Sequence, residues 1–376
     1  MTRFAVIAGG GTAGHVLPAL AIAEGLVDRG HALDEIMYMG AERGIETRLV
    51  PAAGIEHRFF DVVGLQRGSS VSAFVRNLSF LPKLLRARRS AIRVMRRDRP
   101  RVVVSVGGYA SLPAVLAARR LRVPVVVVSY DRTPGRSSRL TSRFAAATAT
   151  AFPGSELPRA RWTGAPVRRA VRMVDRTADR DGARERLGIP VARFVVAVIG
   201  GSLGSRVLNR SVLALVGESS DDRSLAVFHV VGERFVDEHR GDGGVDRDGV
   251  DGVWYRVIGY EDRMSDVYAA CDLLIGRGGA GTVADVATVG VPAVLVPWSG
   301  AADDHQRANV AWLGDEDAVV MLDEDDVTAR LASVVGALRS DPERLDRLGS
   351  RARTLGEPNR RGAIIDLIEE VAGVRP

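Results

Sequence analysis

The sequence predicts two doubly wound α/β domains, each built on a parallel sheet. Short apolar runs alternate with segments of helical period, and this alternation restarts after a polar stretch near the middle of the 376 residues. Buried strands separated by helices are typical of parallel sheets, because right-handed crossovers place helices on both faces. The length suits two domains of roughly 150 residues each. A composition with 46% apolar and 26% charged residues excludes the disordered and fibrous classes.

The first domain is expected to span residues 1–165 and begins with a strand, a loop and a helix. The run from Phe4 to Gly9 is apolar, and Pro18 is expected to open a helix whose apolar residues recur at helical spacing up to Gly30. The same alternation predicts strands at 36–39, 102–106 and 125–129, and helices at 44–50 and 112–121.

The second domain is expected to span residues 166–355. The alternation restarts after the charge-dense stretch from Asp175 to Arg186, to which no element is assigned. Residues 356–376 are expected to form a C-terminal helix, with a return to the first domain as one option. Within the second domain, strands are predicted at 194–199, 225–231, 253–258, 273–275 and 293–296, with helices between them.

Neither a membrane-spanning helix nor a signal peptide is expected. The apolar run from Val123 to Val128 is far shorter than the roughly 20 residues that cross a bilayer. The N-terminus enters a strand-like run at once. A single cysteine, Cys271, excludes an intrachain disulfide and a cysteine metal cage, which favours a reducing cytoplasm.

The charge is distributed unevenly along the chain. The net charge is +6, but residues 1–165 hold 25 Lys+Arg against 11 Asp+Glu, and residues 166–376 hold 27 against 35. Within the first domain, residues 76–101 carry ten basic residues and one acid, interleaved with apolar side chains. Nucleic-acid binding would favour stacking aromatics, which make up only 5% of the chain. A basic and apolar segment of this kind favours an anionic lipid surface.

The first strand leads into a glycine-rich loop, Gly9-Gly10-Gly11-Thr12-Ala13-Gly14. This string fits a dinucleotide-binding loop. Such a fold also needs an acid at the end of its second strand, and here that strand runs into Gly40-Ala41, with Glu42 only beyond. His15, directly after the last glycine, is more informative. A histidine with a pKa near neutrality can remove a proton from a hydroxyl.

Two further loops of the phosphate-binding type lie in the second domain, at 200–204 and 276–282. Each is expected to end a strand and begin a helix, so that backbone N–H groups and the helix dipole can receive a diphosphate. Both loops lack the lysine of a P-loop, which argues against nucleoside triphosphate hydrolysis. Asp285 follows one turn into the next helix, within reach of ribose hydroxyls. These features favour a nucleotide-sugar whose diphosphate is stabilised as it leaves.

The first loop and helix carry a family resemblance. Gly10-Gly11-Thr12-Ala13-Gly14-His15-Val16, followed by Pro18-Ala19-Leu20-Ala21, resembles the signature of the MurG family of peptidoglycan N-acetylglucosaminyltransferases. Further matches occur in family order along nearly the whole chain: Leu49-Val50-Pro51, Gly107-Gly108-Tyr109, Val123-Pro124-Val125-Val126, Gly164-Ala165-Pro166-Val167-Arg168, Gly200-Gly201-Ser202, Thr282-Val283, and Gln306 with Asn309.

The resemblance implies an activity and a fold. The activity is transfer, with inversion and without a metal or cofactor, of N-acetylglucosamine from UDP-N-acetylglucosamine to the 4-hydroxyl of an undecaprenyl-linked muramoyl-pentapeptide, converting lipid I to lipid II. The fold is two Rossmann-like domains facing a cleft, the GT-B arrangement. It also implies a peripheral position on the cytoplasmic face of the cell membrane, with contact to the anionic inner surface through residues 76–101.

The resemblance also implies roles for individual residues. His15 is the candidate catalytic base, and Gly11 and Tyr109 lie on the acceptor side. The residues expected to bind the donor are Thr12, Ala13, Gly14, Asp131, Arg168, Ser202, Ala280, Gly281, Thr282, Val283, Ala284, Asp285 and Gln306.

Departures from the family pattern keep alternatives open. Ser129 stands where the family has an acid, and Asp131 where it has an asparagine. A transferase of the same fold that acts on another lipid or natural-product acceptor is therefore the main alternative. A UDP-N-acetylglucosamine epimerase would need further acids in the cleft. A catalytically silent scaffold is disfavoured by the retention of His15, Ser202 and Gln306.

Overall fold

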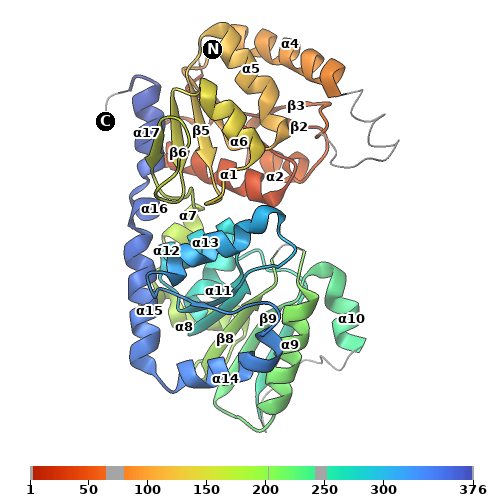
Figure 1. The fold of residues 1–376 in the computed structure, drawn as a ribbon, viewed down its shortest axis with the longest axis vertical. Helices are drawn as coiled ribbons and strands as arrows, with labels where there is room; N and C mark the ends of the chain where they lie inside the picture. The colour runs from red at the N-terminus through yellow and green to blue at the C-terminus, as the bar shows by residue number, and fades with distance from the viewer. Residues whose placement is uncertain (1–2, 65–79, 202, 242–251, 375–376) are drawn as a thin grey trace. The chain divides into compact units, whose positions relative to one another are not determined.

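The computed structural model describes residues 3–64, 80–201, 203–241 and 252–374, and divides into two compact units (Figure 1). Unit 1 comprises Met1–Arg169 and Pro358–Pro376, and unit 2 comprises Ala170–Glu357. Both boundaries lie a few residues beyond the expected ones. The C-terminal segment therefore belongs to the same unit as the N-terminus.

Unit 1 is built on a seven-stranded sheet in the described part of the chain. Its order is β3-β2-β1-β4-β5-β6-β7, and every pairing is parallel. The predicted fold class is confirmed here, although β3, β6 and β7 were not predicted. The strands are β1 (Ala5–Ala8), β2 (Ile36–Ala41), β3 (Glu56–Phe60), β4 (Val102–Ser105), β5 (Val125–Ser129), β6 (Ala147–Thr150) and β7 (Ala160–Trp162).

Helices cover both faces of this sheet because alternate strand residues point to opposite sides. Val6, Val103 and Val125 belong to the core beneath α4 and α5, whereas Ile7 and Val104 belong to the core beneath α1 and α17. The helical segments of unit 1 are α1 (Ala13–Asp28), η1 (Leu33–Glu35), α2 (Glu46–Ala52), α4 (Phe80–Asp98), η2 (Tyr109–Ser111), α5 (Leu112–Leu121), α6 (Arg136–Thr141), η3 (Ser142–Phe144) and α17 (Ala363–Val371), with α16 (Glu357–Arg361) at the boundary between units.

The first helix begins earlier than predicted. It starts at Ala13 and not at Pro18, which lies inside it. The Thr12 carbonyl accepts hydrogen bonds from the N–H groups of His15 and Val16, so the chain turns into the helix directly from the glycine loop. As a result His15 lies in the first turn of α1, where a side chain can reach the end of the sheet.

Unit 2 repeats the plan with a six-stranded parallel sheet among its described residues, ordered β10-β9-β8-β11-β12-β13. The strands are β8 (Phe194–Ile199), β9 (Leu225–Val230), β10 (Trp254–Ile258), β11 (Leu273–Arg277), β12 (Ala293–Val296) and β13 (Val320–Met321). The helical segments are α7 (Arg169–Arg172, entering from unit 1), α8 (Arg176–Leu187), α9 (Arg206–Glu218), η4 (Glu233–Phe235), α10 (Val236–Gly241), α11 (Met264–Ala270), α12 (Ala280–Val289), η5 (Ala302–Asp304), α13 (His305–Gly314), α14 (Val327–Arg339) and α15 (Pro342–Leu355).

The charge-dense stretch at 175–186, to which no element was assigned, forms most of helix α8. Asp175 caps the helix by accepting hydrogen bonds from the N–H groups of Thr177 and Ala178, at 3.0 and 3.2 Å. The Arg184 side chain is fully buried and pairs with Asp272 at 2.8 Å. A buried ion pair from this segment therefore holds α8 against the residue that precedes β11.

In each unit the strand order reverses at one point. The chain proceeds from β1 to β2 and β3 on one side and then places β4 on the other side of β1; β8 and β11 are arranged in the same way. Ligands in sheets of this type bind at the carboxyl ends of the strands beside such a switch point. No helix in the described part of the chain is long and apolar enough to cross a membrane.

Candidate active site

The switch point of unit 1 holds His15. Its ring lies between the loop after β1 and the loop after β4, and its Nδ1 is 3.0 Å from Thr12 Oγ1. Gly108 makes this packing possible: its φ is +73°, and a Cβ there would lie 2.6 Å from the Gly10 carbonyl oxygen. The ring is therefore held by a hydroxyl on one side and by close glycine backbone on the other.

The electrostatic surroundings of His15 favour the neutral imidazole. Burial lowers the pKa of His15 below its ordinary value, and the negative charges of Asp131 and Glu46 oppose that shift. Asp131 follows the end of β5, close enough to His15 for its charge to act on the ring, and its predicted contact with the donor stays a prediction. A neutral imidazole near pH 7 is the form that can accept a proton.

Glu46 lies beneath the first glycine loop and was missed by the sequence analysis. It is fully buried at the start of α2, and its carboxylate accepts hydrogen bonds from the Gly11 N–H, at 3.0 and 3.1 Å, and from the Ala41 N–H, at 3.3 Å. Glu46 therefore fixes the loop that carries Thr12. An acid in a short helix gives no sequence signal for this role, because its partners are backbone groups of other segments.

The two residues expected on the acceptor side lie together. A Cβ at Gly11 would be 3.3 Å from the Tyr109 ring, so the ring covers the loop at its glycine. Tyr109 follows β4 and is half-buried. Thr12, Ala13 and Gly14 form the adjoining N-terminus of α1, where free N–H groups and the helix dipole face outward.

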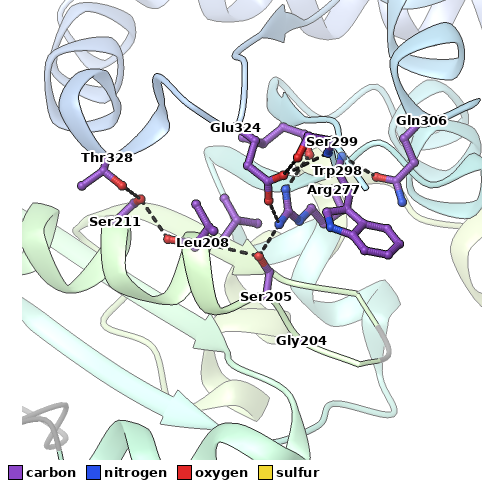
Figure 2. A network of polar contacts seen from close by, with 12 residues as sticks. Gly204, Ser205, Leu208, Ser211, Arg277, Trp298, Ser299, Gln306, Glu324 and Thr328 are labelled. Carbon is purple, nitrogen blue, oxygen red and sulfur yellow. Dashed lines mark hydrogen bonds and ion pairs between the residues drawn. The ribbon is translucent and has the colours of Figure 1, made fainter. Parts of the chain in front are cut away.

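The switch point of unit 2 is organised by Arg277, at the end of β11. Figure 2 shows its guanidinium between Ser205 and Glu324, with Ser299 bonded to the same carboxylate. Arg277 Nη2 donates to Ser205 Oγ at 2.5 Å, and Ser205 Oγ caps α9 by accepting from the Leu208 N–H. Hydrogen bonds from Ser299 and Arg277 hold the pKa of Glu324 below its ordinary value against the opposing effect of burial.

This network fixes three loops at one edge of the sheet. Arg277 joins the loop after β8 to the loop after β11, and Glu324 adds the loop after β12 by accepting from the Ser299 N–H at 2.9 Å. The predicted glycine loops at 200–204 and 276–282 are thus adjacent. Glu324 follows the short strand β13, and its role was not predicted, because the acidic run around it resembles an ordinary exposed turn.

Gln306 lies in the first turn of α13 beside the same loops. Its Oε1 accepts a hydrogen bond from the Trp298 N–H at 3.0 Å, which leaves the amide NH2 group as the donor for a ligand (Figure 2). A Cβ at Gly278 would lie 2.8 Å from the Gln306 carbonyl oxygen, so the loop and α13 are in close contact.

Helix α12 contains the predicted run Ala280, Gly281, Thr282, Val283, Ala284 and Asp285 and begins at Ala280, after Gly279. Its N-terminus therefore opens at the switch point, as an anion-binding site requires. Val283 and Ala284 are buried against the unit, and the Val283 N–H donates to the Gly279 carbonyl at 3.0 Å, so the donor contacts of these two residues stay predictions. Asp285 is half-buried and lies one turn further along.

The donor contacts predicted for Arg168 and Ser202 are not tested by the structure. Arg168 belongs to unit 1, where its guanidinium pairs with Glu24 of α1 at 2.6 Å, and the Arg169 N–H donates to the same carboxylate at 2.8 Å. Its donor contact stays a prediction. Ser202 lies outside the described residues.

Two doubly wound units, each with a glycine-rich helix N-terminus at its switch point and one with a histidine beside it, have the architecture of a two-domain glycosyltransferase. Models of the glycosyltransferase family 28 N-terminal and C-terminal domains match residues 5–150 and 195–360. The chain belongs to the MurG family within this class, which confirms the resemblance seen in the sequence.

The relatives match over nearly full length. A transferase of Desulforudis audaxviator is 35% identical over 98% of this chain and 98% of its own, and one of Clavibacter sepedonicus is 38% identical over 99% and 97%. Both are named UDP-N-acetylglucosamine–N-acetylmuramyl-(pentapeptide) pyrophosphoryl-undecaprenol N-acetylglucosamine transferase. The crystal structure of Acinetobacter baumannii MurG matches with a TM-score of 0.74 and 28% identity over 98% of this chain and 99% of that one.

Proposed function

We propose that this protein transfers N-acetylglucosamine from UDP-N-acetylglucosamine to the lipid-linked muramoyl-pentapeptide, converting lipid I to lipid II in peptidoglycan synthesis. The near full-length similarity to transferases of that name carries this assignment. The chemistry of the two switch points supports it, because one offers a proton acceptor and the other offers helix N-termini for a diphosphate.

In the proposed mechanism, the acceptor hydroxyl gives its proton to His15 as its oxygen bonds to the anomeric carbon. The bond from that carbon to the diphosphate breaks on the opposite face, so the configuration inverts. Thr12 orients the imidazole through Nδ1, which leaves Nε2 as the proton acceptor. The negative charge that develops on the leaving diphosphate is stabilised by the N-termini of α9 and α12.

The donor contacts proposed from the sequence divide between the units. Thr12, Ala13, Gly14, Asp131 and Arg168 belong to unit 1. Those of unit 2 are Ser202, Ala280, Gly281, Thr282, Val283, Ala284, Asp285 and Gln306, of which Gln306 and Asp285 offer side chains to the sugar and the ribose.

The alternative function is transfer to a different acceptor, which the replacement of the family's acid by Ser129 leaves open. Ser129 is buried at the end of β5, and Asp131, two residues further on, acts electrostatically on His15. We propose that Asp131 supplies the negative charge near the base that the family's acid would otherwise supply.

Turnover with a panel of acceptors tests the function directly. Labelled UDP-N-acetylglucosamine is supplied with a short-chain lipid-linked muramoyl-pentapeptide or with other lipid-linked sugars. Labelled disaccharide from the muramoyl acceptor supports the proposal. Product from another acceptor alone, free epimerised donor, or no turnover would each contradict it.

We further propose that α4 rests on an anionic lipid surface. Ala87, Ala91 and Met95 are buried against unit 1, whereas Leu81 and Leu85 are 59% and 41% exposed. The exposed basic residues of the helix are Arg86, Arg89, Arg93, Arg96 and Arg97. Residues 76–79 of the basic segment lie outside the described residues.

Vesicle flotation tests this attachment. We expect binding to anionic vesicles that weakens with salt, and a clear loss in an Arg89→Glu/Arg93→Glu variant, because each basic residue contributes about 1 kcal/mol near such a surface. Arg210→Glu, an exposed arginine of α9, is the control. Binding that is insensitive to salt or equally weakened by the control would overturn the proposal.

A further inference from the structure

The carboxylate of Asp285 is held by a residue to which no role has been assigned. Its Oδ2 accepts a hydrogen bond from the Tyr268 hydroxyl at 2.9 Å. Tyr268 lies on α11, is 3% exposed, and reaches across to α12. The bond therefore connects two helices at the edge of unit 2 where the glycine loops meet.

The two oxygens of this carboxylate have different surroundings. Within the described part of the chain, Oδ1 has no hydrogen-bond partner, and it is not among the buried side-chain atoms without one. Oδ1 is therefore not completely buried, although the carboxyl group as a whole is largely shielded from solvent. One oxygen is fixed from inside the unit, and the other is available to a ligand.

We propose that Tyr268 is a positioning residue for nucleotide binding: its hydroxyl orients the Asp285 carboxylate so that Oδ1 accepts a hydrogen bond from a ribose hydroxyl of the donor. This inference rests on the proposed function and deepens it. Tyr268 itself does not contact the ligand.

The phenol also affects the protonation of Asp285. Burial raises the pKa of Asp285 to about 7, and the hydrogen bond from Tyr268 opposes that rise. Among the described residues, no charged group of α11, α13, α15 or the adjoining strands contributes to this shift. Without the hydroxyl the pKa rises further, so the carboxyl is mostly protonated near neutral pH and is a poorer acceptor.

Binding of UDP to the full-length chain, measured by calorimetry at two pH values, tests this role. For Tyr268→Phe we expect the Kd to rise about tenfold at about pH 7 and by less at about pH 9, where Asp285 is ionised in both proteins and only its orientation differs. In turnover, the donor KM should rise while kcat at saturating donor changes little.

Two further variants make the result decisive. Asp285→Asn, which cannot ionise, should bind UDP weakly at both pH values. Tyr255→Phe removes another buried hydroxyl of unit 2, one bonded to His229 and His239, and should leave UDP binding unchanged. Unchanged UDP binding by Tyr268→Phe at both pH values would overturn the positioning role. A wild-type chain that does not bind UDP would instead overturn the proposed function.

Discussion

At the scale of single residues, the environment of His15 sets the pH dependence of the proposed reaction. Burial keeps its pKa below the ordinary value, so the base is free near neutrality. We expect kcat/KM to rise with pH and to level off above a pKa lower than about 6.5.

Removing the charge of Asp131 should shift this profile. That charge raises the pKa of His15, so Asp131→Asn should move the acid limb of the kcat/KM profile to lower pH. Glu42→Gln, which changes an exposed acid that does not act on His15, is the control. An unchanged or upward-shifted limb in Asp131→Asn would contradict this electrostatic account.

Site residues that were chosen from local motifs lie close together in the structure, and their roles stay predictions. His15, Gly11 and Tyr109 were chosen from short strings, and the structure brings them together at one switch point. Glu46 and Glu324 were not found, because their partners are backbone N–H groups or an arginine from distant segments. Such roles become visible only once the fold brings these partners together.

At the scale of elements, strand prediction depended on hydrophobicity. The valine-rich runs that form β4 and β5 were predicted, but the edge strand β3, Glu56–Phe60, is partly exposed and begins with three polar residues. β6, Ala147–Thr150, consists of small residues that give little hydrophobic signal. Helix α8 was also missed for lack of a hydrophobic signal, because most of its side chains are charged or polar and it buries few residues.

Helix α17 should be essential to the stability of unit 1. Ile364, Ile365 and Ile368 belong to the core that α1 covers, and Ile365 lies against Gly25 of α1. Ile368→Ala empties a position that is 0% exposed, so we expect a loss of about 2–5 kcal/mol in the free energy of unfolding.

A surface change on the same helix is the control for that measurement. Glu370 pairs with Arg161 in solvent, so Glu370→Ala should cost no more than about 1 kcal/mol. Denaturant unfolding of both variants checks the pair. Similar losses for the two would show that α17 does not contribute to the core in the way described.

At the scale of the whole molecule, the two units differ in whether one continuous segment of the chain forms them. Unit 2 is one continuous segment with its own core, whereas unit 1 needs residues 358–376 to cover its sheet. We expect a fragment of residues 170–357 to unfold cooperatively and to bind UDP. A fragment of residues 1–169 should show no cooperative transition until a peptide of residues 358–376 is added.

Thermal unfolding followed by circular dichroism checks both fragments. A cooperative transition in the 1–169 fragment alone would contradict the role given to the C-terminal segment.

The uneven charge of the chain also has a structural meaning at this scale. The basic half carries α4 and the proposed base. The acidic half offers helix N-termini to a diphosphate in place of net positive charge.

The central claim is that His15 removes the acceptor proton during transfer of N-acetylglucosamine. The most direct test is the rate of labelled disaccharide formation by His15→Ala, compared with the wild type and with His57→Ala, a histidine of β3 outside the site. We predict a loss of about 10²–10⁴-fold in kcat for His15→Ala, the usual contribution of a general base, with little change in the donor KM or in the control. A His15→Ala rate within a few-fold of the wild type would contradict the account.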